Sequence, residues 1–164
     1  MKKLISFFIL MTLLSCNGKG GSSSSAASEN NTIPLQDETV ATEFMKLVNN
    51  HRISIGLGTI AHSDRMVLIA AEHSAAMANK SVSFGHTGFS GRCSEARDAL
   101  GGGNLCAENV AMGQKNAPAV FTSWMNSTSH RANIENPRIT HSGLGTATSS
   151  SGTVYWTHLF LELN

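Results

Sequence analysis

Two histidines and one glutamate stand in separate short polar motifs in the second half of the sequence. His86 ends Phe-Gly-His, Glu108 begins Glu-Asn-Val-Ala, and His130 follows Trp-Met-Asn-Ser by three residues. Two imidazoles and a carboxylate can bind a divalent cation such as Zn²⁺, with a fourth position left to water. They can equally form a hydrogen-bonded cluster in which pairing offsets burial. We favour the cluster because no local His-x-x-x-His chelate supports the metal.

Hydrolysis is a further possibility for these groups. A metal held by His86, Glu108 and His130 could acidify its bound water, and Tyr155 in Tyr-Trp-Thr would lie nearby as a donor. Ser127 stands three residues before His130, but no Gly-x-Ser-x-Gly motif accompanies it. A serine-protease interpretation is therefore disfavoured, and a binding protein is favoured over an enzyme.

Length and charge restrict the class of protein. The chain has 164 residues, a net charge of +1 and 41% hydrophobic residues, which fits one globular domain. No segment carries a basic stripe, so nucleic acid is not an expected partner. We expect a monomer.

The N-terminus has the pattern of an export signal. Two lysines precede an apolar run over 4–14, and Ser15-Cys16 follows it, which resembles a bacterial lipobox. We therefore expect residues 1–15 to be a lipoprotein signal peptide and Cys16 to be acylated, which would anchor the protein to a membrane. A plain secretory signal is the alternative. Asn17 rather than Asp after the cysteine favours the outer membrane or cell surface within the cell envelope.

The remaining sequence divides into a tether and a domain. Residues 16–33 are rich in Gly, Ser and Asn and are expected to be a flexible tether, while 34–164 form the domain. Cys93 and Cys106 are an even pair in an exported domain, which predicts a disulfide worth roughly 3 kcal/mol. A cysteine metal site is the alternative, but their spacing does not match a zinc motif.

Apolar spacing and turn residues predict the secondary structure. Helices are expected over 37–53, from Asp64 after the N-cap Ser63 to about 80, and from Asn116 to Met125. Residues 82–103 are expected to be a long loop with room for a short helix at 94–100, and 126–130 a polar exit. Strands are expected over 105–112, 140–148 and 153–163, the last two as a hairpin. The class is α+β.

The ordered motifs resemble those of the CAP superfamily of cysteine-rich secretory, antigen 5 and pathogenesis-related proteins, in its short bacterial form. The resemblance also includes Gly-Leu-Gly at 143–145 and covers roughly 38–163. It implies an α-β-α sandwich with a central antiparallel sheet between helical layers, and a cleft that contains His86, Glu108 and His130. Eukaryotic members have a second acid and a second histidine where this chain has Ser127 and Tyr155, so their four-residue cluster is not intact.

Other polar residues are expected to be structural. His158, where the family usually has Gln, should point away from Tyr155 because side chains alternate along a strand. His73 should be a core histidine, and Asn109 should bind backbone and fix the strand edge.

The favoured function is the binding of a small ligand, a lipid or an envelope component at the cleft that contains His86 and Glu108. The alternatives are a divalent-metal-dependent hydrolase acting on peptide or cell-wall material, and a surface interaction protein with an inert cleft. A fold alone specifies no single activity.

Overall fold

The computed structural model describes residues 36–163, which lie within one compact unit, Ile33–Asn164. Cys16, the signal peptide and the tether lie outside the described residues. Within 36–163, none of the helices has the length and apolar character needed to cross a membrane.

The central sheet has four strands in the order β1-β3-β4-β2. The predicted hairpin is confirmed as β3 (His141–Thr148) and β4 (Val154–Leu161), which pair antiparallel. The strand predicted at 105–112 is β2 (Cys106–Met112), which pairs antiparallel with β4 and forms one edge of the sheet. The other edge is β1 (Ala61–His62), a two-residue strand parallel to β3 that was not predicted.

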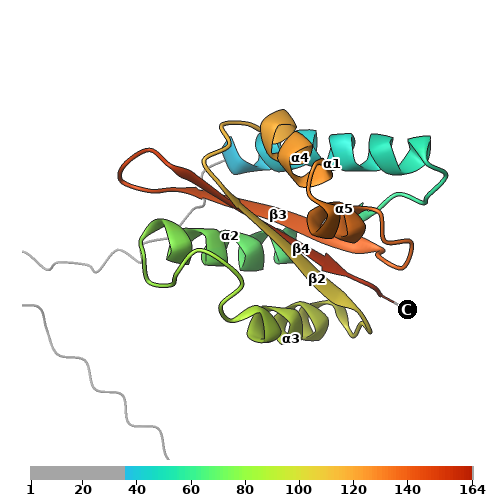
Figure 1. Cartoon of the computed structure of the whole chain (residues 1–164). Coiled ribbons are helices and arrows are strands. Elements are labelled where there is room, and N and C mark those ends of the chain that lie inside the picture. The colour runs from blue at the N-terminus through green and yellow to red at the C-terminus, as the bar shows by residue number, and fades with distance from the viewer. Residues whose placement is uncertain (1–35, 164) are drawn as a thin grey trace, which may run out of the picture. The chain divides into compact units, whose positions relative to one another are not determined.

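Helices cover both faces of this sheet (Figure 1), which confirms the α-β-α sandwich. One layer contains α1 (Gln36–Ser54), α4 (Ala117–Met125) and α5 (Thr128–Ile134), and the other contains α2 (Asp64–Ala78) and α3 (Phe89–Leu100). Side chains alternate between the two faces of the sheet along β4, so the core is divided into two clusters. Trp156 and Phe160 pack in the cluster with α1 and α4, while Leu159 and Leu161 pack in the cluster with α2 and α3.

The predicted helix starts at Ser63 and Asn116 are confirmed by their capping bonds. The Met66 amide donates to Ser63 Oγ at 3.3 Å, and the Ala119 amide donates to Asn116 Oδ1 at 2.9 Å. Each bond satisfies one of the amides that the first turn of a helix leaves unpaired.

Two other helical segments differ from the predictions. The short helix expected at 94–100 begins at Phe89, five residues earlier, with Gly88 rather than a capping side chain before it. The polar exit expected at 126–130 is wrong, because Thr128 already begins α5, whose buried residue is Ile134. A seven-residue helix with one buried position has no apolar stripe to recognise in sequence.

The Gly-Leu-Gly motif lets α2 pack directly on β3. A Cβ built on Gly145 would lie 2.0 Å from the Ala71 amide nitrogen, and one on Gly143 would lie 2.3 Å from that of Val67. Ser74 Oγ, on the same helix, lies 3.0 Å from the Gly145 carbonyl oxygen and 2.8 Å from Thr157 Oγ1. The glycines thus fix the distance of the α2 layer from the sheet.

Candidate functional site

Three segments meet at the β2 edge of the sheet. The edge strand carries Glu108, the loop after α2 carries His86, and α3 carries Arg92. The disulfide predicted between Cys93 and Cys106 is confirmed, with the two Cα atoms 6.0 Å apart. Because Cys93 follows Arg92 and Cys106 begins β2, this bond holds α3 against the strand that carries Glu108.

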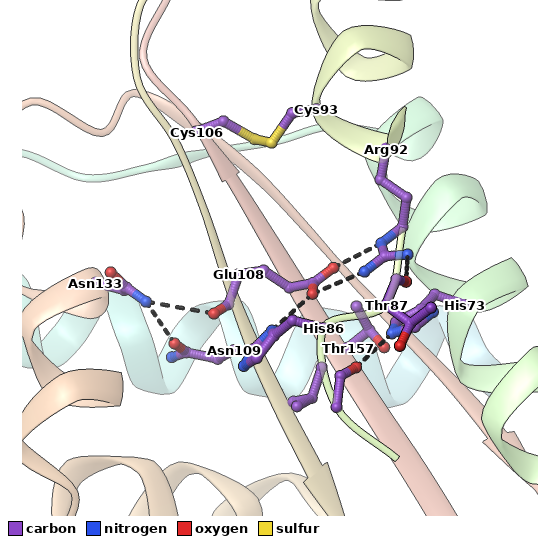
Figure 2. A network of polar contacts seen from close by, with 12 residues as sticks. His73, His86, Thr87, Arg92, Cys93, Cys106, Glu108, Asn109, Asn133 and Thr157 are labelled. Carbon is purple, nitrogen blue, oxygen red and sulfur yellow. Dashed lines mark hydrogen bonds and ion pairs between the residues drawn. A yellow bond between two sulfur atoms is a disulfide. The ribbon is translucent and has the colours of Figure 1, made fainter. Parts of the chain in front are cut away.

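Glu108 is the buried centre of the site, and its side chain is only 1% exposed. Arg92 donates from Nε to Oε2 at 2.7 Å and from Nη2 to Oε1 at 2.9 Å. His86 Nδ1 lies 2.8 Å from Oε1. Figure 2 shows both partners directed at the carboxylate of Glu108. A carboxylate paired with an arginine can only accept, so the His86 proton lies on Nδ1.

Arg92 was not predicted as a site residue, although it donates two of the three side-chain hydrogen bonds that the Glu108 carboxylate accepts. Its side chain is 11% exposed, and its Nη1 donates to the Thr87 carbonyl oxygen at 2.7 Å. The guanidinium therefore connects α3, the His86 loop and β2. Such a bidentate pair is stronger and more directional than a contact with a lysine ammonium.

His86 is the accessible member of this cluster, with a side chain that is 52% exposed. Its ring lines an open groove of about 330 Å³. The other residues along this groove are Phe89, Cys106, Ala107, Glu108 and Asn133. With Nδ1 held by Glu108, the free Nε2 of His86 remains for an incoming molecule.

A second polar network lies next to this one. Asn109 Nδ2 donates to the His130 carbonyl oxygen at 3.0 Å, and Asn133 Nδ2 donates to Asn109 Oδ1 at 2.8 Å. Asn133 Nδ2 also lies 3.4 Å from the Glu108 carbonyl oxygen (Figure 2). The prediction that Asn109 fixes the strand edge by binding backbone is confirmed, since these bonds tie α5 to β2.

His130 does not join the carboxylate of Glu108. Side chains of adjacent strand residues point to opposite faces, so Glu108 faces α3 while Asn109 faces α5, which carries His130. The His130 ring instead lies 6.2 Å from that of Trp124, centroid to centroid. Burial lowers the pKa of His130, and the charge of the nearby His86 lowers it further.

The site offers a divalent metal no ready set of ligands. In the part of the chain that the structure describes, no three His, Cys, Asp or Glu side chains are grouped so that they could hold a metal ion. Both oxygens of Glu108 already accept hydrogen bonds from Arg92. The residues His86, Glu108 and His130 therefore do not fit a zinc site as they are arranged.

Two further residues lie beside the cluster rather than in it. The Tyr155 ring lies 6.4 Å from the half-exposed ring of Phe84, and Tyr155 does not line the groove. His73 is 4% exposed, and its Nε2 lies 2.8 Å from the Gly85 carbonyl oxygen, which confirms it as a satisfied core histidine. Burial lowers the pKa of His73, and the positive charge of Arg92 acts in the same direction.

His158 lies in the opposite core, as the alternation along β4 predicted. It is completely buried among aromatic rings, with its centroid 3.9 Å from that of Phe160 and 5.0 Å from that of Phe44. Neither ring nitrogen has a hydrogen-bond partner among residues 36–163. Burial lowers the pKa of His158 to about 3.

The comparisons with known proteins agree with this architecture. A stretch of 54 residues is 48% identical to the uncharacterized protein YkwD of Bacillus subtilis and covers 33% of this chain and 20% of YkwD. The fold is similar to that of an extracellular protein containing an SCP domain from Bacillus anthracis, with a TM-score of 0.67 and 22% sequence identity. That match covers 77% of this chain and 41% of the Bacillus anthracis chain. An outer surface protein of Borrelia burgdorferi has a TM-score of 0.63 at 19% identity, with 75% and 92% covered.

The chain spans less than half the length of these two Bacillus proteins. Its own sequence matches the family described as "CAP: Cysteine-rich secretory protein family" over residues 45–160, a range that includes β1, β2, β3, all but the last residue of β4, and the three segments of the site. The chain therefore belongs to the CAP family of cysteine-rich secretory proteins.

Proposed function

We propose that this chain is an exported, lipid-anchored CAP protein that binds a small ligand, a lipid or an envelope component in the groove beside His86 and Glu108. The observation that carries this proposal is the contrast within the cluster. Glu108 is buried and paired with the partly buried Arg92, while His86 is held by Glu108 and half-exposed in the groove. Such an arrangement fixes the orientation of one polar group for a ligand.

Other observations support the export of the protein and its lipid anchor. The apolar run before Ser15-Cys16 supports a lipoprotein signal, and the disulfide and the secretory family support an oxidising location outside the cytoplasm. The full chain should fractionate with membranes, and Cys16→Ser should release it. Persistence of the serine variant in the membrane fraction would contradict the lipid anchor.

Ligand binding is tested with the full chain in detergent, incubated with envelope extract and washed. Small molecules and cell-wall fragments that stay bound are identified by mass spectrometry. We expect His86→Phe to retain less of the bound molecule, because the ring remains but its hydrogen-bonding nitrogens are removed. The matched control is His62→Phe, since His62 also pairs with a carboxylate, that of Asp64 at 3.0 Å, but lies outside the groove.

The same experiment distinguishes a ligand-binding groove from the alternative, a surface interaction protein with an inert cleft. If His86→Phe and the wild type retain the same molecule equally, the groove is inert and binding occurs elsewhere on the surface. If neither retains anything, the binding proposal is contradicted.

In the metal-dependent hydrolase, a cation would have to compete with Arg92, which donates a hydrogen bond to each carboxylate oxygen of Glu108. Calorimetry with Zn²⁺ on the full chain tests this. Micromolar binding that is lost in His86→Ala, Glu108→Gln and His130→Ala would favour the hydrolase over simple ligand binding.

A further inference from the structure

We infer that the groove beside His86 takes a neutral, hydroxyl-bearing ring, such as a sugar unit, rather than an anion or a metal ion. This inference rests on the proposed function and names the ligand class for the same groove. It follows from the side-chain hydrogen-bonding atoms that remain free along the groove and from the apolar residues around them.

The charged groups of the site are already used within the protein. The two Glu108 oxygens accept from Arg92 and His86, and the Glu108 side chain is 1% exposed. All three guanidinium nitrogens of Arg92 donate inward, two to Glu108 and one to the Thr87 carbonyl oxygen. Arg92 is not among the residues that line the groove, so an anionic ligand would meet no arginine there, and a cation would meet a carboxylate already paired with Arg92 and His86.

Among the described residues, the side-chain polar atoms that remain free along the groove are hydrogen-bond acceptors. His86 donates through Nδ1, so in the neutral ring its Nε2 carries a free lone pair. The amide nitrogen of Asn133 is held by Asn109 and the Glu108 backbone, so its Oδ1 is left as an acceptor. Both residues line the groove. Two acceptors call for a ligand that supplies donors, as hydroxyl groups do.

The rest of the groove lining is apolar. Phe89 contributes an aromatic ring, Ala107 a methyl group, and Cys106 one half of the disulfide. A ring with hydroxyl groups at its rim and C–H bonds on its face would meet both kinds of surface. Ligand sites commonly combine apolar walls with a few oriented polar groups in this way.

The test uses the full chain in detergent, labelled with ¹⁵N and titrated with an N-acetylglucosamine trimer, inorganic phosphate or Zn²⁺. We expect the saccharide to shift the Phe89 and Ala107 amides and the Asn133 side-chain amide. His86→Phe should weaken this binding about three- to tenfold, the equivalent of one lost hydrogen bond. His62→Phe should bind as the wild type does.

A groove that responds to phosphate or Zn²⁺ but not to the saccharide would overturn the ligand class while leaving a binding groove in place. A groove that responds to none of the three would also overturn the class. The envelope-extract experiment then decides the proposed function separately, because a molecule retained through His86 would show binding by another kind of ligand.

Discussion

Arg92 and Glu108 form a bidentate pair beneath the groove, with Nε 2.7 Å from Oε2 and Nη2 2.9 Å from Oε1. The pair neutralises the buried carboxylate and leaves it in position to hold His86. It also places a guanidinium directly beside the carboxylate, where its positive charge repels a cation. The properties of the site are thus determined as much by Arg92 as by the two histidines that the motifs emphasise.

Removing Arg92 should therefore destabilise the fold. Arg92→Met keeps much of the side-chain volume but leaves the Glu108 charge buried with His86 as the remaining side-chain partner of its carboxylate. We expect a loss of about 3 kcal/mol in the free energy of unfolding, measured by urea denaturation. The matched control is Arg65→Met, which breaks the exposed pair of Arg65 with Glu95 and should cost less than about 1 kcal/mol. Equal losses in the two variants would contradict a buried structural pair.

His158 should make the domain sensitive to acid. The folded protein lowers the pKa of His158 from 6.5 to about 3, so the unfolded chain takes up a proton that the folded protein does not. The stability present above pH 6.5 is therefore lost as the pH falls toward 3, by roughly 5 kcal/mol in total. The free energy of unfolding measured by urea denaturation across this range should fall less steeply in His158→Phe. An unchanged slope would show that His158 is not buried in its neutral form.

Burial also lowers the pKa of His73 and of His130. Both residues should therefore also decrease the free energy of unfolding as the pH falls. The wild-type slope should therefore exceed that of a single histidine, and His158→Phe should remove only part of it.

Gly145 should tolerate no side chain. An added Cβ would lie 2.0 Å from the Ala71 nitrogen, which is backbone of α2 and can move only with the helix. Gly145→Ala should cost about 3 kcal/mol or more in thermal or urea unfolding. Gly58→Ala is the control, because nothing lies within 4 Å of its added Cβ, and a change within about 0.5 kcal/mol is expected. A tolerated Gly145→Ala would show that α2 does not pack this closely on β3.

The disulfide should support both stability and the groove. Replacing Cys93 and Cys106 together by Ala should cost about 3 kcal/mol, because the bond closes a loop with a sequence separation of 13. The same variant should broaden or shift the Phe89 and Ala107 amide resonances, since α3 loses its covalent link to β2. Unchanged resonances would show that the remaining contacts hold the groove wall without it.

The parts of the fold that were predicted correctly have local signals. Ser63 and Asn116 are capping residues followed by apolar stripes, and the turn at 149–152 separates two strand-like runs. The two-residue strand β1 and the short helix α5 have no such pattern, because their positions depend on pairing with β3 and packing on β2. Tertiary contacts, rather than local propensity, decide these segments.

The candidate site was predicted in part. The family motifs pointed to His86 and Glu108, which do meet. Arg92 lies in a glycine-containing stretch without periodicity, and nothing local links it to a carboxylate 16 residues away. Strand alternation directs Asn109 rather than Glu108 toward α5, and the Asn109 amide binds the His130 carbonyl oxygen.

The most direct test of the site is the proton position on His86, read from long-range ¹H–¹⁵N NMR spectra of the imidazole in the full chain above pH 7.5. The geometry predicts a proton on Nδ1, directed at Glu108, with Nε2 left as the acceptor, and a change in the Nδ1 resonance in Glu108→Gln. A proton found on Nε2, or a ring that does not respond to Glu108→Gln, would contradict the proposal that Glu108 orients His86 toward a ligand.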